Sequence, residues 1–264
     1  MVVEIDNIYD SRVASYMSLT HHELQLSGED GVFIAESPKV IKVALEEGYT
    51  PLSLLCERKH IEGDAAEIIA SVPGLTVFTG SREVLADLTG YKLTRGVLCA
   101  FKRKPSTDID EICRHAKKIA VIENVCDTTN IGSIFRSAVA LGTDAILLTP
   151  ESCDPLNRRA VRVSMGAVFK IPWAFCSDPV EILNNYGFST IALALHKDAI
   201  PIESKEFDGI EKYAVVLGTE GDGLSDKIIS KCLYKMIIPM WRNVDSLNVG
   251  AAAAIAFWRL NRQK

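Results

Sequence analysis

The chain has 264 residues, 48% of them hydrophobic, and a formal net charge of −5, which suits one large domain or two smaller ones. The acidic balance excludes a protein that coats nucleic acid through its overall field, so any nucleic acid must bind local basic patches. No apolar run reaches membrane-spanning length, and no two of the seven cysteines sit at a metal-ligand spacing, so we expect neither a membrane partner nor a bound metal.

The first hundred residues alternate strand and helix patterns. Strands are predicted at residues 31–35, 53–56, 75–78 and 96–101. Ser37-Pro38 predicts the start of a helix that continues to Leu45, because proline is tolerated in the first turn. Residues 102–108 are charged and interrupted by proline, which is typical of a linker. We therefore place a small α/β domain at residues 1–104.

Residues 105–264 form the second predicted domain. Its strands are near-continuous apolar runs at residues 118–122, 145–148, 190–195, 213–217 and 236–239. Such runs suit strands that are buried on both faces, as in a parallel sheet between two helix layers. Helical patterns alternate with them, which predicts a doubly wound α/β fold.

The first of three unusual strand-to-loop segments spans residues 123–136. Asn130 is a predicted N-cap for a helix that ends near Gly142. One face of that helix is apolar and must be packed, while Gly132, Ser133 and Arg136 fall on the opposite face. A lone arginine among small residues is open to a ligand, but the spacing fits a solvated surface arginine equally well.

The second segment, residues 217–224, contains three glycines, which let the backbone approach a ligand closely. Its spacing is not the dinucleotide-binding fingerprint, and it carries two acids. It therefore favours a neutral or cationic ligand over a phosphate.

The third segment, residues 238–250, leads into a helix that is apolar nearly all round. Ser246 or Asn248 is expected to cap this helix. A helix without a polar face is buried by more than its own sheet, which predicts a subunit interface.

These three segments, together with residues 157–167, resemble in order the motifs of the SpoU (TrmH) family of RNA 2′-O-methyltransferases, in the SPOUT superfamily. The match covers roughly residues 117–260. Residues before the linker resemble, more loosely, the small ribosomal-protein-like α/β domain that many members use to bind RNA. The resemblance implies a deep trefoil knot that holds the cofactor, and a homodimer packed around the knot.

The resemblance also implies the chemistry: S-adenosylmethionine is the methyl donor and a ribose 2′-hydroxyl is the acceptor. The residues that match cofactor-binding positions are Leu195, Gly218, Gly221, Ile238 and Leu247. The residues that match catalytic positions are Asn130, Arg136, Glu220, Ser246 and Asn248. Because a guanidinium is a poor proton acceptor, we assign Arg136 to clamping an RNA phosphate and stabilising the developing 2′-oxyanion. Ser246 and Asn248 would orient the ribose.

The remaining predictions concern partners and location. Arg158, Arg159 and Arg162 fall within about one helical turn and are predicted to bind RNA phosphates, although solvated surface charge is the alternative. Residues 241–243 replace small, glycine-containing sequence and are expected to reshape the pocket mouth. The chain start lacks a signal-peptide pattern, which predicts a cytoplasmic protein.

The target RNA stays open at this point. Ribosomal RNA is favoured over transfer RNA, because family members with this accessory domain often act on it. Two other functions remain: a non-catalytic RNA-binding or ribosome-assembly factor, and a knotted enzyme that methylates a base.

Overall fold

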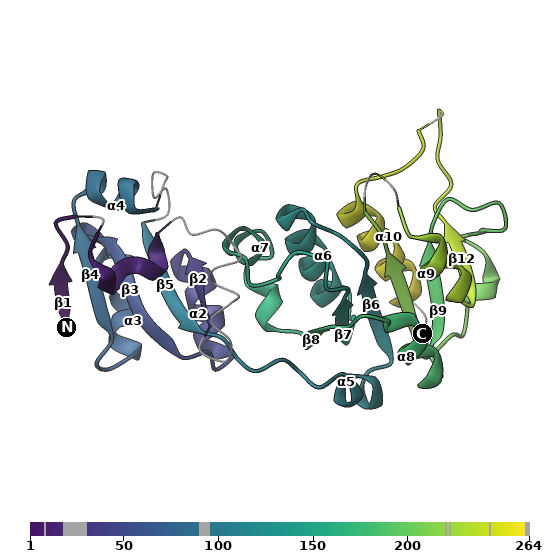
Figure 1. The fold of residues 1–264 in the computed structure, drawn as a ribbon, viewed down its shortest axis with the longest axis horizontal. Helices are drawn as coiled ribbons and strands as arrows, with labels where there is room; N and C mark the ends of the chain where they lie inside the picture. Colours follow the sequence, from purple (N-terminus) through teal and green to yellow (C-terminus); the bar gives the residue numbers. More distant parts are fainter. Residues whose placement is uncertain are drawn as a thin grey trace. The chain divides into compact units, whose positions relative to one another are not determined.

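The structure is a computed structural model (Figure 1). It describes residues 1–7, 9–17, 31–89, 96–219, 221, 223–242 and 244–261. The chain divides into two compact units. The first comprises Met1–Pro105 and Leu156–Phe169, and the second comprises Ser106–Pro155 and Lys170–Lys264. Among the described residues, no helix is long and apolar enough to cross a membrane.

The first unit is built on a mixed five-stranded sheet in the order β1-β4-β3-β5-β2. Its strands are β1 (Val2–Glu4), β2 (Val32–Glu36), β3 (Pro51–Glu57), β4 (Thr76–Gly80) and β5 (Val97–Lys102). Its helices are α2 (Pro38–Glu46), α3 (Ala66–Ser71), α4 (Arg82–Thr89) and α7 (Arg158–Val163), with 3₁₀ turns η1 (Ser11–Tyr16), η3 (Arg58–His60) and η4 (Ala167–Phe169). The four predicted strands are present, and β1 was not predicted because three residues carry too little pattern.

The segment Leu156–Phe169 groups with the first unit, although it was predicted to belong to the second domain. The physical reason is aromatic packing. The ring of Phe169 lies 5.4 Å from that of Phe33 and 5.0 Å from that of Tyr49, measured between centroids. Apolar contacts with residues more than a hundred positions away therefore override the position of the segment in the chain.

The second unit contains a seven-stranded sheet in the order β10-β12-β9-β11-β6-β7-β8, with every neighbouring pair parallel. Its strands are β6 (Lys118–Ile122), β7 (Ala145–Leu148), β8 (Trp173–Phe175), β9 (Ser189–Leu193), β10 (Ile200–Pro201), β11 (Tyr213–Leu217) and β12 (Tyr234–Ile237). Its helices are α5 (Ile109–His115), α6 (Thr128–Ala140), α8 (Pro179–Asn185), α9 (Asp226–Lys231) and α10 (Val249–Asn261), with the 3₁₀ turn η5 (Lys205–Phe207). The predicted α/β fold with a parallel sheet is confirmed.

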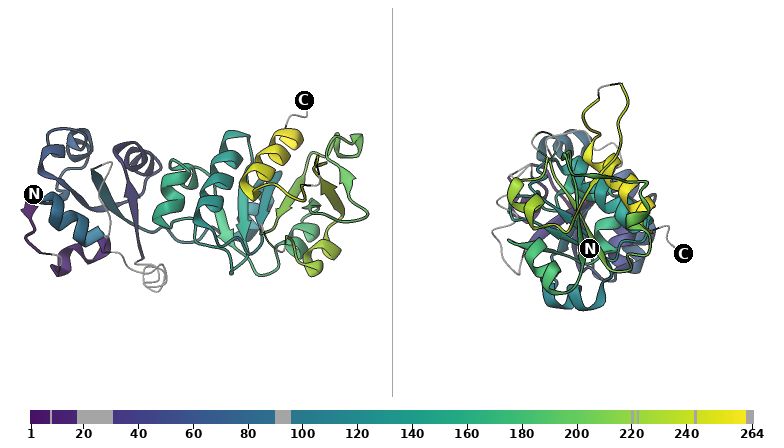
Figure 2. Two further views of the ribbon diagram at one scale, coloured as in Figure 1. Left: turned by 90° about the horizontal axis from the view of Figure 1, so that it is seen from above. Right: turned by 90° about the vertical axis from the view of Figure 1, so that its right-hand side faces the viewer.

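Helices cover both faces of this sheet (Figure 2). Alternate residues of β6, β7 and β11 share one buried cluster with apolar side chains of α5, α8 and α9. Helices α6 and α10 pack together on the other face. Because successive strand residues point to opposite faces, each strand is apolar throughout, which explains the continuous runs in the sequence.

Helix α6 starts before its predicted N-cap and ends, as predicted, close to Gly142. Asp127, not Asn130, is its N-cap, and the Asp127 side chain accepts hydrogen bonds from the N–H groups of Thr129 and Asn130. The helix ends at Ala140, and Gly142 follows with φ = 80°. The face with small residues is also not open, because Gly132 is buried and α10 packs there.

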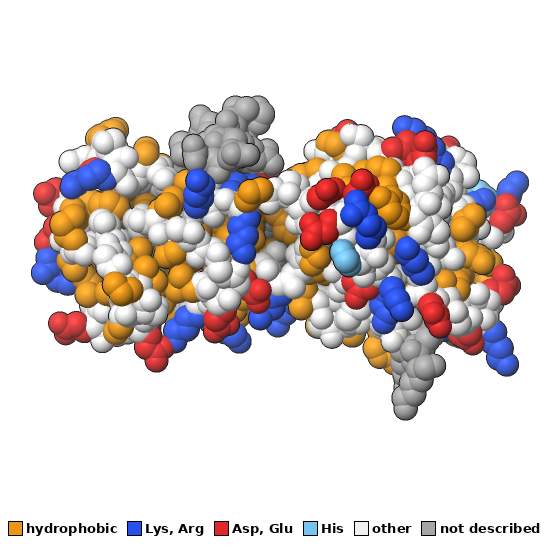
Figure 3. Space-filling view, turned by 90° about the horizontal axis from the view of Figure 1, so that it is seen from below, with side chains coloured by type: hydrophobic (Ala, Val, Ile, Leu, Met, Phe, Trp, Pro, Cys, Tyr) orange, Lys and Arg blue, Asp and Glu red, His pale blue; other side chains and the backbone are white. Residues whose placement is uncertain are grey.

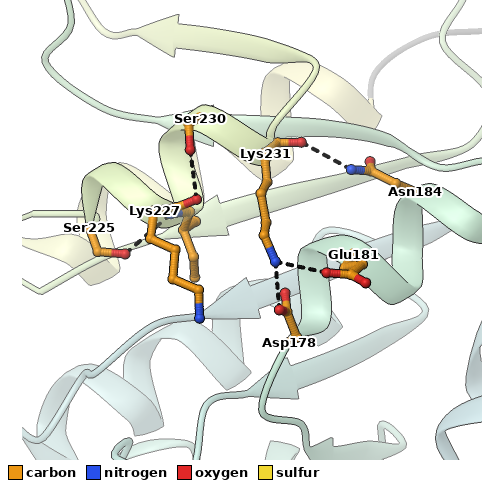
Figure 4. Close-up of polar contacts among 8 residues, drawn as sticks. Asp178, Glu181, Asn184, Ser225, Lys227, Ser230 and Lys231 are labelled. Atoms are coloured by element: carbon orange, nitrogen blue, oxygen red, sulfur yellow. Dashed lines mark hydrogen bonds and ion pairs between the residues drawn. The ribbon is translucent and has the colours of Figure 1, made fainter.

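Helices α8 and α9 are joined by a network centred on Lys231 (Figure 4). Lys231 Nζ donates to Asp178 Oδ2 (2.6 Å) and Glu181 Oε2 (2.9 Å), and Asn184 Nδ2 donates to Lys231 O (3.0 Å). The hydrogen bond from Lys231 lowers the pKa of Asp178. The network fixes α9, whose residue Ile229 borders the pocket described below.

The surface mixes both signs of charge, as a net charge of −5 suggests. On the face drawn in Figure 3, basic and acidic side chains are interspersed with apolar ones. A face with both signs of charge has no uniform positive field for a polyanion, and the expected use of local basic patches stays a prediction.

Ser37 is strained in a way that glycine would relieve. Its backbone has φ = 85° and ψ = 144°, a region that only glycine adopts freely. Its side chain is buried, and its Oγ has no hydrogen-bond partner among the described residues. We expect Ser37→Gly to raise the free energy of unfolding by about 1 kcal/mol, since relief of strain exceeds the added chain entropy.

Urea titration measures this change. Ser37→Ala is the matched control, because it removes the hydroxyl and keeps the strain. A gain for Ser37→Ala equal to that for Ser37→Gly would show that the hydroxyl, and not the backbone, is the source.

Candidate functional site

The second unit has a pocket of about 270 Å³ at the carboxyl ends of β9, β11 and β12. Ligands bind at this edge in parallel α/β sheets. Its walls come from strand ends, from α9 and α10, and from two loops. The lining residues are Leu193, Ala194, Leu195, Leu217, Gly218, Thr219, Gly221, Gly223, Leu224, Ile229, Met236, Ile237, Ile238, Met240, Asp245, Ser246, Leu247, Val249 and Ala252.

The first of the two loops is called the glycine loop here, and its described residues are Gly218, Thr219, Gly221, Gly223 and Leu224. It follows β11 and closes on itself, since the N–H of Thr219 donates to Gly223 O (3.3 Å). A Cβ on Gly218 would lie 2.4 Å from the carbonyl carbon and oxygen of Gly223, which only glycine avoids. Close approach of the loop ends therefore requires glycine at position 218.

The second loop joins β12 to α10 and projects from the unit (Figure 1). Its base lines the pocket through Ile238, Met240 and residues 245–247. Trp241, in the same loop, is 86% exposed, and the expected effect of residues 241–243 on the pocket mouth stays a prediction.

The electrostatics of the pocket favour a cation or a neutral ligand. Asp245 is the one charged residue among the described lining residues, and most of the others are apolar. A polyphosphate would meet a carboxylate and no described cation, which is unfavourable. The prediction of a neutral or cationic ligand agrees with this geometry.

The five predicted cofactor-binding residues, Leu195, Gly218, Gly221, Ile238 and Leu247, all line this one pocket. Four of them follow the ends of β9, β11 and β12, which are adjacent in the sheet, and Leu247 lies just before α10. The structure thus brings the whole set together, while their role stays a prediction.

The predicted catalytic residues lie in two places. Ser246 lines the pocket, and the neighbouring Asn248 donates from Nδ2 to Asn130 Oδ1 (2.8 Å). Asn248 Oδ1 also accepts from the N–H groups of Gly250 (3.0 Å) and Ala251 (3.3 Å), so Asn248 caps α10 as expected. Glu220 lies outside the described residues.

Arg136 is the exception, because the structure does not place it in the pocket wall. It is exposed on α6, six residues and about 9 Å of helix beyond Asn130. Among the described residues its guanidinium makes no hydrogen bond or ion pair. The guanidinium of Arg136 can therefore bind an anionic ligand without breaking an interaction with another described residue.

The three arginines predicted to bind RNA are all on or beside α7, in the first unit, and they are not equivalent. Arg162 forms an ion pair with Glu36, which is 2% exposed (3.6 Å). Arg158 has a partner of its own. Arg159 is exposed, and no described partner engages its guanidinium, so it is the best placed of the three for a phosphate.

Two carboxylates were not predicted, one in the pocket wall and one next to the glycine loop. Asp245 lies beside Ser246 in the third segment, where an acid next to a candidate site residue was an available signal. Glu123 follows β6 and contacts Ser225, a pairing across 102 positions that no local pattern indicates. In the described part of the chain, no three His, Cys, Asp or Glu side chains gather as they would to hold a metal ion.

Comparison with known proteins agrees with this geometry. The family model described as "SpoU rRNA Methylase family" matches residues 117–258. An uncharacterised tRNA/rRNA methyltransferase of Mycobacterium bovis is 37% identical over 87% of this chain and 80% of the relative. The 23S rRNA (guanosine-2′-O-)-methyltransferase RlmB of Acinetobacter baylyi is 28% identical over 72% of this chain and 80% of the relative. The crystal structure of an AdoMet-bound rRNA methyltransferase from Sinorhizobium meliloti superposes with a TM-score of 0.83, at 25% identity, over 99% of this chain and 98% of that one.

The glycine loop yields a stability prediction. We expect Gly218→Ala to lower the free energy of unfolding by about 1–3 kcal/mol, because the new Cβ must displace backbone at Gly223. The amides of the glycine loop should also exchange hydrogen faster. Gly221→Ala is the matched control, since a Cβ there meets nothing within 4 Å. Denaturant titration and hydrogen–deuterium exchange measure both variants. Equal effects of the two substitutions would show that the close approach of Gly218 to Gly223 is not the reason why position 218 requires glycine.

Proposed function

The chain belongs to the SpoU rRNA methylase family, and on that premise we propose that it is an RNA methyltransferase acting on a ribose 2′-hydroxyl with S-adenosylmethionine as donor. The observation that carries the proposal is the convergence of all five predicted cofactor-binding residues on one pocket. Ribosomal RNA is the favoured substrate, because RlmB, a relative by sequence, is named for the 23S rRNA. Transfer RNA and a non-catalytic role in ribosome assembly are the alternatives.

The pocket fits this donor. Its apolar walls suit an adenine ring, and the carboxylate of Asp245 suits a positively charged sulfonium. Leu195, Gly218, Gly221, Ile238 and Leu247 would hold the group. When bound, S-adenosylmethionine supplies a methyl group that its sulfonium already activates. The S. meliloti neighbour is described as AdoMet-bound, which supports the assignment.

The protein's own residues then have to align the 2′-oxygen and stabilise its charge. Ser246 lines the pocket, and the hydrogen bond to Asn130 fixes the orientation of Asn248. These two side chains orient the ribose. Arg136, whose guanidinium is free among the described residues, clamps an RNA phosphate and stabilises the oxyanion, and the proton leaves to phosphate or water.

We extend the proposal to the trefoil knot, a homodimer through the knotted domain and a cytoplasmic location. The knot is supported by the two loops, after β11 and after β12, that line the same pocket. The dimer is supported by apolar side chains that α10 leaves in solvent: Ile255 is 38% exposed and Trp258 is 51% exposed. Burying such side chains against a second copy would be favourable.

Methyl transfer to ribosomal RNA tests the proposal. The wild-type protein should transfer a labelled methyl group that blocks alkaline cleavage at the modified nucleotide. Arg136→Ala should lower turnover by about 100-fold or more with donor affinity unchanged, because one preorganised donor to an oxyanion contributes that much. Arg136→Lys should fall between, since lysine keeps the charge and loses the bidentate geometry.

Three results would contradict this account. A methyl group found on a base would show that the base, and not the ribose, is the acceptor. The absence of transfer to any RNA would favour the non-catalytic role in ribosome assembly. Full turnover in Arg136→Ala would contradict the role of Arg136 in binding a phosphate and stabilising the oxyanion, and it would not affect the rest of the proposal.

The arginines of α7 give a second prediction. Arg159→Ala should weaken RNA binding and reduce the slope of log affinity against log salt by about 0.7–0.9, the value for one lost phosphate contact. Arg162→Ala should instead lower the stability of the protein, because the buried Glu36 loses this ion pair. RNA titrations at several salt concentrations measure the slope. Arg114→Ala, an exposed arginine on α5, is the control, and an equal slope change there would reject the assignment.

A further inference from the structure

Glu123 is a buried carboxylate that the proposed reaction does not use. It follows β6 directly and is 5% exposed. The register of β6 with β11 pairs Ile122 with Leu217, so Glu123 lies beside Gly218 at the pocket edge of the sheet. Its N–H donates to Leu217 O (2.8 Å), which extends the ladder by one bond.

Both carboxylate oxygens of Glu123 contact one residue, Ser225. Oε2 accepts from the backbone N–H of Ser225 (2.9 Å), and Oε1 accepts from its hydroxyl (2.6 Å). The same hydroxyl oxygen accepts from the N–H of Ile228 (3.3 Å) and caps α9. Hydrogen bonds to an ionised acceptor are about twice as strong as neutral ones. Glu123 therefore fixes the residue at which the glycine loop ends and α9 begins.

The glycine loop depends on such an anchor. Glycines lose more conformational freedom on ordering than other residues, and this loop has three. One end is held by β11, and the other is held at Ser225. Thr219, Gly221, Gly223 and Leu224, which lie between the two anchors, line the pocket. Order imposed before a ligand arrives lowers the free-energy cost of binding it.

We propose that Glu123 is a positioning residue for the methyl donor, which acts through Ser225 to hold the glycine loop in its receptive shape. This inference rests on the proposed function. The described partners of the carboxylate are uncharged groups of Ser225. A buried carboxylate with such partners carries a desolvation cost that an apolar residue would avoid, so stability alone does not explain it.

The chain offers a matched control in Asp144. Its Oδ2 also accepts two backbone hydrogen bonds, from the N–H groups of Lys117 (2.8 Å) and Lys118 (2.9 Å), at the opposite end of β6. Asp144→Ala therefore removes a similar pair of bonds from the same sheet without touching the pocket. Glu123→Gln, which retains one acceptor, is the conservative variant.

Calorimetric titration of S-adenosylmethionine and of its uncharged-sulfur product S-adenosylhomocysteine measures the effect. Glu123→Ala should bind both ligands about 10- to 100-fold more weakly, the result of losing two charge-assisted bonds. Glu123→Gln should lose less, and Asp144→Ala should bind like the wild type. Hydrogen–deuterium exchange without ligand should show faster exchange in the glycine loop of Glu123→Ala alone.

Three other outcomes would overturn the inference. Unchanged affinity and exchange in Glu123→Ala would show that the loop holds its shape unaided. A loss confined to the sulfonium ligand would mean that Glu123 acts through its charge, and an equal loss in Asp144→Ala would mean general destabilisation. If Glu123→Ala does not fold, Ser225→Ala is used in its place, because it removes the hydroxyl that donates to Glu123 Oε1. The same measurements are then compared with those of Asp144→Ala. Failure of the wild type to bind either ligand would refute the proposed function, whereas the exchange data would still decide whether Glu123 orders the loop.

Discussion

Parallel pairing of β6, β11, β9 and β12 is the constraint on which the site depends. The register aligns Ile122 with Leu217, and Val216 with Ala192, so the carboxyl ends of the strands meet at one edge of the sheet. The segments that follow β9, β11 and β12 form a single pocket, whose described lining residues fall between Leu193 and Ala252. Continuous apolar strands make this possible, because helices bury both faces and leave the strand ends as the place where polar groups collect.

The same edge sets the geometry of the two helices that carry the polar residues. Helices α6 and α10 pack closely because their contact uses small residues: a Cβ on Gly250 would lie 2.9 Å from Ser133 Cβ. Each helix begins with a side-chain cap, Asp127 or Asn248. Asn248 also bonds to Asn130, so one side chain caps its own helix and ties it to the neighbour. The side-chain amide of Asn248 is therefore oriented before any substrate binds, because it accepts hydrogen bonds from the first N–H groups of α10 and donates one to Asn130.

The sequence predicts those features whose physical cause is local. The bounds of β6, β7 and β11 agree with their apolar runs to the residue, because burial on both faces leaves no ambiguity of period. Helix α6 was predicted to start too late, since Asp127 and Asn130 are both good capping residues and only the fold selects between them. Other features depend on partners that are distant in sequence. They are the grouping of residues 156–169 with the first unit, the packing of α10 against the face of α6 that contains Gly132, the position of Arg136 outside the pocket wall, and the hydrogen bonds from Ser225 to Glu123. No local pattern encodes such contacts. The motifs therefore predicted five residues that line the pocket, but they did not predict the interactions that hold these residues in place.

The separation of charges in this chain suits a reaction between a cation and a polyanion. The described pocket wall carries a carboxylate, Asp245, and is otherwise uncharged, whereas the unengaged guanidinium of Arg136 lies on α6, outside the described pocket wall. RNA phosphates are repelled by the first environment and attracted by the second, and a sulfonium experiences the reverse. A mixed site with both signs would let phosphate and donor compete for the same groups. In the proposed reaction, the donor would bind in the environment of Asp245 and the RNA phosphate at Arg136, and the neutral ribose would be the group that both environments have to reach.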